Sequence, residues 1–396
     1  MSTWSKPDDI KRKIDYRWKK GDILRHCLLK DDLFPLVIKL DAPSYKELSL
    51  YFSNVIIWIT QLKEKEKLKR GYGYELIEKE INYRTIGKNS IPTHAQISSL
   101  EDAIKILHKQ REVELFISNT HNLLQRWKGL QEWILRYPFK LIKSIGNDCD
   151  KFITVLEWFE THPNHYLYLR QLDIPSIDTK FIENNKTVIG ELLEILLPTE
   201  QVNMSAKNFE EKFYLRQKPK MIRFRILDSR YTWQGISDLT VPIEEFSQWR
   251  PGFEKIFFTE NEINFLSFPK VENSCIIFGK GYGVEIFKMA KWIADKKIYY
   301  WGDIDTHGFN ILSIARGFLP NLKSFLMTEE ILLEHREMWV NEEKQHLSEI
   351  ENLTYEESIL VSKLQNDYFG KGIRLEQERV AFGFVEKFIE NLIKFN

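Results

Sequence analysis

Two segments of the sequence end in carboxylates where buried strands are predicted to stop. Residues 255–260 (KIFFTE) predict an apolar strand closed by Glu260, and residues 298–305 (IYYWGDID) predict an apolar, aromatic strand closed by Asp303 and Asp305. Helical segments separate such strands, which favours a parallel sheet. Functional groups of parallel sheets gather at the carboxyl ends of the strands. We therefore expect these three carboxylates to meet at one edge of a sheet.

Three carboxylates at one place repel one another and require a counter-ion. Like charges within hydrogen-bonding range disfavour full ionisation, so the pKa of at least one carboxyl group should be raised. Oxygen ligands without cysteine favour Mg²⁺ or Mn²⁺ over zinc. Such an ion can bind phosphate oxygens, activate a water or tyrosine nucleophile, and stabilise the leaving oxygen of a phosphodiester. The alternative is structural, with Asp305 capping the following helix and Asp303 lying on the surface.

Further polar residues accompany these carboxylates. The loop GKGYG at residues 279–283 follows another apolar strand, and its Lys280 could contact a phosphate as a point charge. His307 could donate a hydrogen bond to a phosphate or to the leaving oxygen, although local capping of a helix explains it as well. Glu262 is an alternative to Glu260, which we prefer because it directly ends the apolar strand.

The third section of the chain, residues 251–396, must position these groups. Short apolar strands alternate there with amphipathic helices, one of them at residues 284–297, and this order predicts a parallel sheet with right-handed crossovers. The predicted strands span residues 255–260, 274–283, 298–305 and 322–327.

The second section, residues 151–250, has the order of a winged-helix-like, CAP-type module. An amphipathic run that Pro198 stops is followed by a helical candidate at residues 206–215 and by the strand KPKMIRFRILD. The second helix of such a module can enter a DNA groove while strand residues contact phosphates. A buried sheet with exposed basic residues fits the same alternation. The candidate DNA-binding residues on this strand are Lys218, Lys220, Arg223 and Arg225.

The first section, residues 1–150, predicts a mostly helical arm. Residues 34–41 predict a strand, the segment SYKE is a capping box that starts a helix, and residues 71–96 could form a hairpin. Between residues 100 and 137 apolar positions recur at helical spacing, which indicates one or two long helices. Such a stripe is typical of core packing, so we assign it no chemistry.

Composition sets the broad class. With 396 residues, of which 43% are hydrophobic and 13% aromatic, the chain can bury large cores and is long enough for two or three domains, so we expect an α/β multidomain fold. No apolar run approaches the length of a membrane span, and the N-terminus lacks the apolar core of a signal peptide, so we expect a soluble, cytoplasmic protein without membrane contact. Three scattered cysteines argue against a zinc site and a disulfide framework.

The net charge of zero hides an asymmetry along the chain. Residues 1–70 and 207–230 are net basic, whereas residues 321–396 are net acidic. Basic segments ahead of an acidic one suggest an anionic partner engaged by the first two thirds of the chain. Ordinary solvated faces would produce the same pattern.

The motifs resemble those of a known family. A glutamate after one strand and D-x-D after a later one, with a G-K-G-Y loop between them, resembles the Toprim domain of topoisomerase VI A subunits, where a winged-helix module precedes it. The segments TENEINFLSFP, YYWGDIDTHGFNIL, LMTEE, LLEHREMW and IRLEQERV look like the Wadjet JetD family. The N-terminal segments FPLVIKLDAPS and IDTKFIE agree. The resemblance covers nearly the whole chain.

The resemblance implies a nuclease of an anti-plasmid defence system. In Wadjet systems a condensin-like complex of an SMC-type ATPase, a kleisin and an accessory protein extrudes double-stranded plasmid DNA and presents it to JetD for cutting. The Toprim metal positions then fall on Glu260, Asp303 and Asp305. Because the topoisomerase VI relatives are dimers, a homodimer is implied as well. Glu376 and Glu378 in IRLEQERV receive no role, and either a solvated helix or an outer shell around the metal fits them.

One departure concerns the nucleophile. Topoisomerase VI A subunits use a winged-helix tyrosine within an R-[DE]-x-Y-Y-like motif to form a covalent link to DNA. The nearest candidates here, Tyr166, Tyr168 and Tyr231, do not match that motif. We therefore expect metal-dependent hydrolysis rather than transesterification.

Two other functions fit parts of the sequence. DIDTH matches the D-x-D-x-T opening of haloacid-dehalogenase-type phosphatases, but that motif belongs on a first strand, and the later acidic pair of those enzymes is missing. The other alternative is a non-catalytic DNA-binding protein of the same complex, whose carboxylates only organise the fold.

Overall fold

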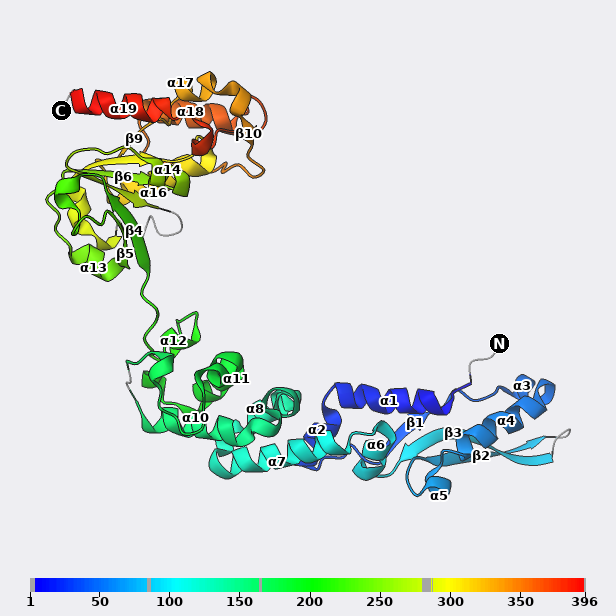
Figure 1. The fold of residues 1–396 in the computed structure, drawn as a ribbon. Helices are drawn as coiled ribbons and strands as arrows, with labels where there is room; N and C mark the ends of the chain where they lie inside the picture. The colour runs from blue at the N-terminus through cyan, green and yellow to red at the C-terminus, as the bar shows by residue number, and fades with distance from the viewer. Residues whose placement is uncertain (1–3, 84–86, 164–165, 280–285, 287, 395–396) are drawn as a thin grey trace. The chain divides into compact units, whose positions relative to one another are not determined.

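The chain folds into two compact units, unit 1 ending at Gln217 and unit 2 beginning at Lys218. This computed structural model describes residues 4–83, 87–163, 166–279, 286 and 288–394 (Figure 1). Unit 1 has one continuous hydrophobic core, so the predicted division at residue 150 does not separate two cores. Residues 218–250 fold with the C-terminal section rather than with residues 151–217.

Unit 1 is mostly helical, as predicted, and carries one small sheet (Figure 1). Its strands pair antiparallel in the order β1-β3-β2, and β2 with β3 forms the hairpin predicted in residues 71–96. The strands are β1 (Leu36–Lys39), β2 (Glu75–Tyr83) and β3 (Gly87–Ile97). The helices are α1 (Pro7–Lys19), α2 (Asp22–Leu29), α3 (Tyr45–Leu50), α4 (Phe52–Lys63), α5 (Lys67–Arg70), α6 (Leu100–Leu107), α7 (Gln110–Arg126), α8 (Gln131–Arg136), α9 (Pro138–Lys140), α10 (Cys149–Thr161), α11 (Thr179–Leu196) and α12 (Phe209–Lys212).

Two predicted helices of unit 1 are interrupted. The predicted capping box is present, with the Ser44 N–H 2.8 Å from a carboxylate oxygen of Glu47, but the helix it starts breaks at Tyr51 into α3 and α4. The helical stretch predicted between residues 100 and 137 breaks at His108, whose φ of 57° lies in the left-handed region. One long helix, the 17-residue α7, is present in this range, and shorter helices precede and follow it.

The two helices predicted for a winged-helix module are present but unequal. α11 ends at Leu196, just before Pro198, as predicted, whereas α12 is a single turn of 4 residues inside the expected range 206–215. The basic strand that should follow them is β4 (Met221–Ile226), and it pairs with strands of unit 2. A winged-helix domain over residues 151–250 is therefore not confirmed.

Unit 2 is built on a six-stranded sheet in the order β5-β4-β7-β6-β8-β9. The last four of these strands are parallel to one another, as predicted, whereas β4 and β5 pair antiparallel and make the sheet mixed. Besides β4, its strands are β5 (Asp238–Pro242), β6 (Lys255–Thr259), β7 (Ser274–Phe278), β8 (Lys297–Trp301) and β9 (Lys323–Ser324). A separate two-stranded ladder joins β10 (Val340–Asn341) to β11 (Ile373–Arg374).

Helices of unit 2 connect and cover these strands (Figure 1). They are α13 (Ile243–Gln248), α14 (Glu262–Ser267), α16 (Thr306–Phe318), α17 (Glu329–Glu334), α18 (Tyr355–Gln365) and α19 (Gly383–Lys394). Of the predicted helix at 284–297, only residues 284, 285 and 287 lie outside the described residues. Lys291–Asp295 forms a short 3-10 helix and Lys297 already belongs to β8, so the predicted helix does not continue to residue 297.

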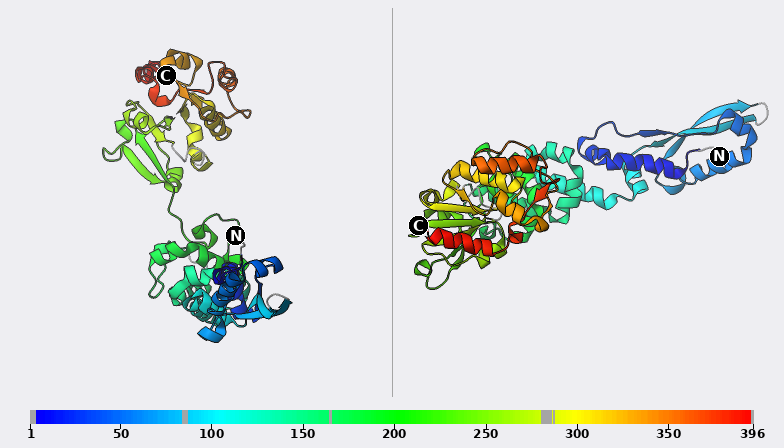
Figure 2. Two further views of the ribbon diagram at one scale, coloured as in Figure 1. Left: turned by 90° about the vertical axis from the view of Figure 1, so that its right-hand side faces the viewer. Right: turned by 90° about the horizontal axis from the view of Figure 1, so that it is seen from above.

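Aromatic side chains fill the core of unit 2. Every residue of β6 is buried, as expected for a parallel strand covered on both faces. On one face Phe257 stacks on Tyr299 at 5.3 Å, and α19 packs there through Phe388 (Figure 2). Successive residues of a strand point to opposite faces, so Tyr300 of β8 points the other way. This alternation brings the Tyr300 hydroxyl to the residue that follows β6.

The remaining broad expectations concern membranes and cysteines. Across the described ranges, no helix combines the length and the apolar character needed to cross a membrane. Cys149 and Cys275 are buried, Cys27 is half-buried, and all three thiols are free in the structure.

Candidate active site

The carboxyl ends of two adjacent strands bring acidic residues to one edge of the sheet. β6 and β8 are parallel neighbours with Thr259 opposite Trp301, so Glu260 and Asp303 follow the two strands at the same edge. Gly279, after β7, donates its N–H to the Thr259 carbonyl at 2.8 Å and therefore starts its loop at this edge too. Lys280 and the rest of the GKGYG loop lie outside the described residues.

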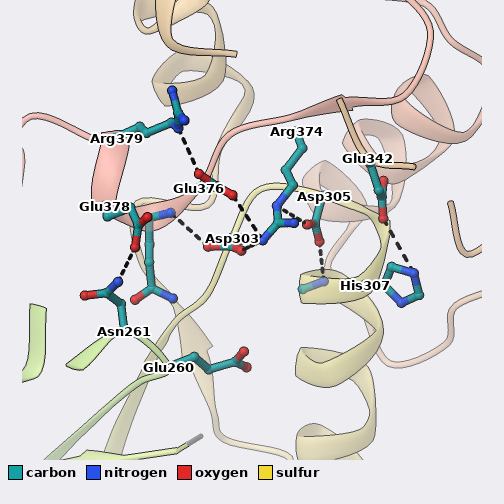
Figure 3. A network of polar contacts seen from close by, with 12 residues as sticks. Glu260, Asn261, Asp303, Asp305, His307, Glu342, Arg374, Glu376, Glu378 and Arg379 are labelled. Atoms are coloured by element: carbon teal, nitrogen blue, oxygen red, sulfur yellow. Dashed lines mark hydrogen bonds and ion pairs between the residues drawn. The ribbon is translucent and has the colours of Figure 1, made fainter. Parts of the chain in front are cut away.

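Asp305 caps the helix that follows it. Its backbone is extended, and its Oδ1 accepts the N–H of Gly308 at 2.6 Å, so the capping interpretation is correct for one carboxylate oxygen (Figure 3). A Cβ on Gly308 would lie only 2.2 Å from the carbonyl oxygen of Asp303. The turn between the two aspartates and α16 is therefore closed so tightly that it requires glycine at position 308.

A single arginine joins the two aspartates. Nη2 of Arg374 lies 2.5 Å from Oδ2 of Asp303, and Nε of the same side chain lies 3.0 Å from Oδ2 of Asp305 (Figure 3). The contact with Asp303 is a hydrogen bond, whereas the contact with Asp305 is an ion pair without hydrogen-bond geometry. Two carboxylates thus converge on one positive charge.

The segment that carries Arg374 is tied to the loop between the aspartates. Ile304 and Leu375 exchange two backbone hydrogen bonds, of 2.9 and 3.1 Å. The backbone N–H of Gln377 donates to Oδ1 of Asp303 at 2.8 Å, and its side chain accepts from the hydroxyl of Thr259. We call residues 373–377 the clasp. Neither Arg374 nor Gln377 is predicted as a site residue, and the only signal was their place in the family motif IRLEQERV.

Glu260 lies beside this network but bonds elsewhere. The hydroxyl of Tyr300 donates to its Oε1 at 2.5 Å. Burial raises the pKa of Glu260, the hydrogen bond from Tyr300 opposes this, and the charge of Asp303 adds to it. The pKa of Tyr300 is itself raised well above its usual value, by burial and by the charge of Glu260. Tyr300 therefore stays protonated, and its hydroxyl donates the hydrogen bond that positions Glu260.

The electrostatics of Asp305 meet the expectation of a raised carboxyl pKa. Burial is the largest cause, the charges of Glu342 and Asp303 add to it, and together they raise the pKa of Asp305 to about 6. The hydrogen bond from Gly308 and the charge of Arg374 oppose the shift without cancelling it. The sequence predicts this shift from repulsion between carboxylates. Repulsion does raise the pKa of Asp305, but burial raises it more.

Replacing Asp305 by Asn should stabilise the protein at neutral pH without divalent cations. The raised pKa means that the folded state binds the proton of Asp305 more tightly than the unfolded state does. The free energy of unfolding therefore falls as the pH rises from about 4 to about 6, and above pH 6 this loss stays constant. Asn keeps the capping oxygen and removes the charge, and the expected gain at pH 7.5 is about 2–3 kcal/mol. Urea unfolding in chelator from pH 4 to 8 measures it.

The matched control is Asp102→Asn in unit 1. Burial raises the pKa of Asp102, but hydrogen bonds from Lys67 and Ser99 outweigh it and lower the pKa overall. This variant should therefore lose stability at pH 7.5, which is the opposite sign. A loss of stability for Asp305→Asn at pH 7.5 would contradict the electrostatic description of the site.

Two other predicted residues lie at the margin of the network. The side chain of His307 is exposed, with Nε2 2.7 Å from the Lys344 carbonyl and 3.8 Å from Glu342, and it does not contact the aspartates (Figure 3). Glu262, the alternative to Glu260, binds Nη1 of Arg223 at 2.6 Å. Glu260 is bonded to Tyr300 of β8, the strand that Asp303 follows, whereas Glu262 is bonded to Arg223 of β4.

The late acidic residues lie next to the site rather than on a solvated helix. Glu376 accepts from Nε of Arg379 at 2.8 Å and lies 3.6 Å from Nη2 of Arg374 (Figure 3). Glu378 accepts a hydrogen bond from the side-chain amide of Asn261, which follows Glu260. Glu376 is part of the clasp, and Glu378 belongs to the short 3-10 turn that continues it.

The candidate DNA-binding residues differ in what they contact. Arg223 forms two hydrogen bonds with Asp238, of 2.9 and 2.7 Å, besides its bond to Glu262. Arg225 donates to the carbonyl oxygens of Leu266 and Phe268. Both guanidinium groups are therefore held by other parts of unit 2. The other two candidates, Lys218 and Lys220, are exposed ahead of β4.

The donor set fits a hard divalent cation. Its atoms are carboxylate oxygens, and two of these already converge on the charge of Arg374. Among the described residues, no three His, Cys, Asp or Glu side chains are arranged to hold a metal ion together. Binding a cation with Glu260, Asp303 and Asp305 therefore requires side-chain rearrangement around Arg374.

The fold and the site define an α/β protein with a mostly helical unit and an acidic sheet edge suited to a cation. A family described as "Wadjet protein JetD, C-terminal" matches residues 214–389, and a family described as "Uncharacterized protein conserved in bacteria N-term (DUF3322)" matches residues 7–194. The first match makes the C-terminal part of the chain similar to the Wadjet JetD family, and the two matches together support that family. No curated protein shows significant similarity to the chain. The Toprim and topoisomerase VI relation stays a prediction.

Proposed function

We propose that this protein is the metal-dependent DNA endonuclease of a Wadjet-type defence system. It hydrolyses closed-circular plasmid DNA that a condensin-like complex of SMC, kleisin and accessory subunits presents. The observation that carries the proposal is the convergence of Asp303 and Asp305 on the guanidinium group of Arg374, beside Glu260. A purely structural role does not require three carboxylates beside one arginine, because the excess negative charge lowers stability, in line with the raised pKa of Asp305 and of Glu260.

Three residues would hold Mg²⁺ or Mn²⁺, namely Glu260, Asp303 and Asp305. Oδ1 of Asp305 is occupied by the Gly308 N–H, and Oδ1 of Asp303 by the Gln377 N–H. Each aspartate therefore offers one oxygen, its Oδ2. Such a small number of protein oxygens is typical of Mg²⁺ sites, because Mg²⁺ keeps several of its waters and binds phosphate oxygens directly. Such an ion supplies the charge that activates a water and stabilises the leaving oxygen of a phosphodiester.

DNA contact falls to other residues. Lys280 and His307 remain the proposed phosphate contacts near the site. Lys218 and Lys220, which are exposed ahead of β4, and Arg223 and Arg225 on the strand remain the proposed DNA contacts, and Arg223 would have to give up two carboxylates to reach DNA. Cutting both strands requires two centres, which supports a homodimer.

Hydrolysis is favoured over a covalent intermediate by the state of two tyrosines in unit 2. The hydroxyl of Tyr231 bonds to Oδ1 of Asn273 at 3.0 Å, and Tyr300 is buried with a raised pKa. The partner of the Tyr231 hydroxyl is an amide oxygen rather than a basic group, and the Tyr300 phenol, which donates to Glu260, is buried away from DNA. We expect cut DNA to run identically on denaturing gels with and without protease treatment. Mobility that depends on protease would show a protein-linked end and exclude hydrolysis.

The central test is cleavage by the purified protein with and without its partner complex. Closed-circular DNA should be cut only when the complex, its ATP and Mg²⁺ are all present, and linear DNA of the same sequence should stay intact. Omitting each component in turn separates the dependence on partner and on metal. DNA binding without cutting under every condition would instead support the non-catalytic alternative.

A further inference from the structure

Arg374 contacts the oxygens that a metal ion would need. Asp303 and Asp305 each use Oδ1 for a backbone N–H and direct Oδ2 at the guanidinium group, at 2.5 and 3.0 Å. A cation that binds both aspartates through their remaining oxygens must therefore replace this guanidinium group. If the arginine and the ion shared these two oxygens, two positive charges would lie close together, and their repulsion disfavours this arrangement.

The backbone around Arg374 is fixed on both sides. Arg374 pairs with Val340 in the β10–β11 ladder, and the next residue, Leu375, exchanges two hydrogen bonds with Ile304. Any rearrangement must therefore come from the side chain, which is 34% exposed and has access to solvent. Glu376, 3.6 Å from Nη2, offers the guanidinium group another carboxylate.

We propose that Arg374 is the resident counter-ion of the site, a positioning residue that holds Asp303 and Asp305 in place without metal and that a divalent ion must displace. The inference rests on the proposed function, because it assumes that the same aspartates bind the ion. Its consequence is a metal affinity weaker than the carboxylates alone would give. The site then stays ordered but unloaded until the ion outcompetes the arginine.

Mn²⁺ binding to the full-length protein without DNA tests the inference, measured by calorimetry and by the EPR signal of free Mn²⁺. Arg374→Gln should bind Mn²⁺ at least about ten-fold more tightly than the parent protein, the change that about 1.4 kcal/mol of released ion-pair energy produces. Arg374→Lys keeps the charge and should stay near the parent affinity. In chelator, Arg374→Gln should melt at a lower temperature, and Mn²⁺ should raise its Tm by more than it raises that of the parent.

Two controls make the outcome specific. Arg379→Gln removes the neighbouring arginine, which bonds to Glu376 and not to the aspartates, and should leave the Mn²⁺ affinity unchanged (Figure 3). Asp303→Asn plus Asp305→Asn gives the background of sites elsewhere. If Arg374→Gln does not fold, Arg374→Met is a second neutral variant for the same measurement.

The possible failures are distinguishable. Aspartate-dependent Mn²⁺ binding that is equal or weaker in the neutral Arg374 variants overturns the counter-ion role and leaves the proposed nuclease intact. Mn²⁺ binding that does not depend on the aspartates in any variant overturns both.

Discussion

The double variant Asp303→Asn plus Asp305→Asn should remain folded, bind plasmid DNA and lose cutting by at least about 1000-fold. Asn retains the oxygen that accepts the Gly308 N–H and the one that accepts the Gln377 N–H, so the loop keeps both hydrogen bonds. What disappears is the pair of charges that attracts the cation. Binding and catalysis should therefore separate cleanly.

The measurement is cleavage of closed-circular DNA in the reconstituted system, with DNA binding and thermal unfolding on the same preparations. A spacing-matched control is Glu349→Gln plus Glu351→Gln, which neutralises two carboxylates outside the site in the same unit, at the same separation along the chain. It should cut at the parent rate. If the aspartate variant cut DNA at the parent rate, Asp303 and Asp305 would not be catalytic residues.

Gly308→Ala should abolish cutting and destabilise unit 2, although it adds only one methyl group. The new Cβ would lie 2.2 Å from the Asp303 carbonyl oxygen, a backbone atom that cannot turn aside as a flexible side chain can. The loop must open, which breaks the cap from Asp305 and shifts both aspartates. Overpacking of this kind costs about 1–3 kcal/mol or more, and small displacements of reacting groups cost about 100-fold in rate.

Gly317→Ala is the matched control, because Gly317 lies on the same helix. The nearest atom to its added Cβ, the side-chain amide nitrogen of Asn352, is 4.0 Å away. Alanine inside a helix is favoured over glycine by about 0.5–1 kcal/mol, so this variant should be as stable as the parent or more so. Urea unfolding and plasmid cutting of both variants decide the matter. Parent-like cutting by Gly308→Ala would show that the loop is not closed as tightly as described.

Local patterns were sufficient to predict the parallel part of the fold. The runs at 255–260 and 298–305 are mostly apolar along their length, which is typical of a strand buried on both faces, and both became strands of the parallel sheet. The strand at residues 221–226 could not be assigned to its sheet in this way. Its alternation of apolar and basic residues describes any strand with one exposed face, so the pairing with β7 depends on contacts distant in sequence.

The same limit explains which parts of the site escaped sequence reasoning. Glu260 and Asp303 are found because each closely follows a recognisable strand. Arg374 belongs to a strand of 2 residues, too short for any periodicity, and stands in a charged run that resembles an ordinary solvated segment. Its role depends on the pairing of Leu375 with Ile304, which no local pattern encodes.

The clasp also determines when the site can exist during synthesis. Asp303 receives its hydrogen bond from a residue 74 positions further along the chain, and Thr259 bonds to the same residue across 118 positions. While a ribosome is still making the intervening segment, the aspartates lack both Arg374 and the Gln377 N–H. Domains fold in order as the chain emerges, so the strands of the sheet are available before the loop is held in place. A nascent chain therefore carries the acidic residues of the site without its geometry, and the geometry is acquired only after translation has passed the clasp.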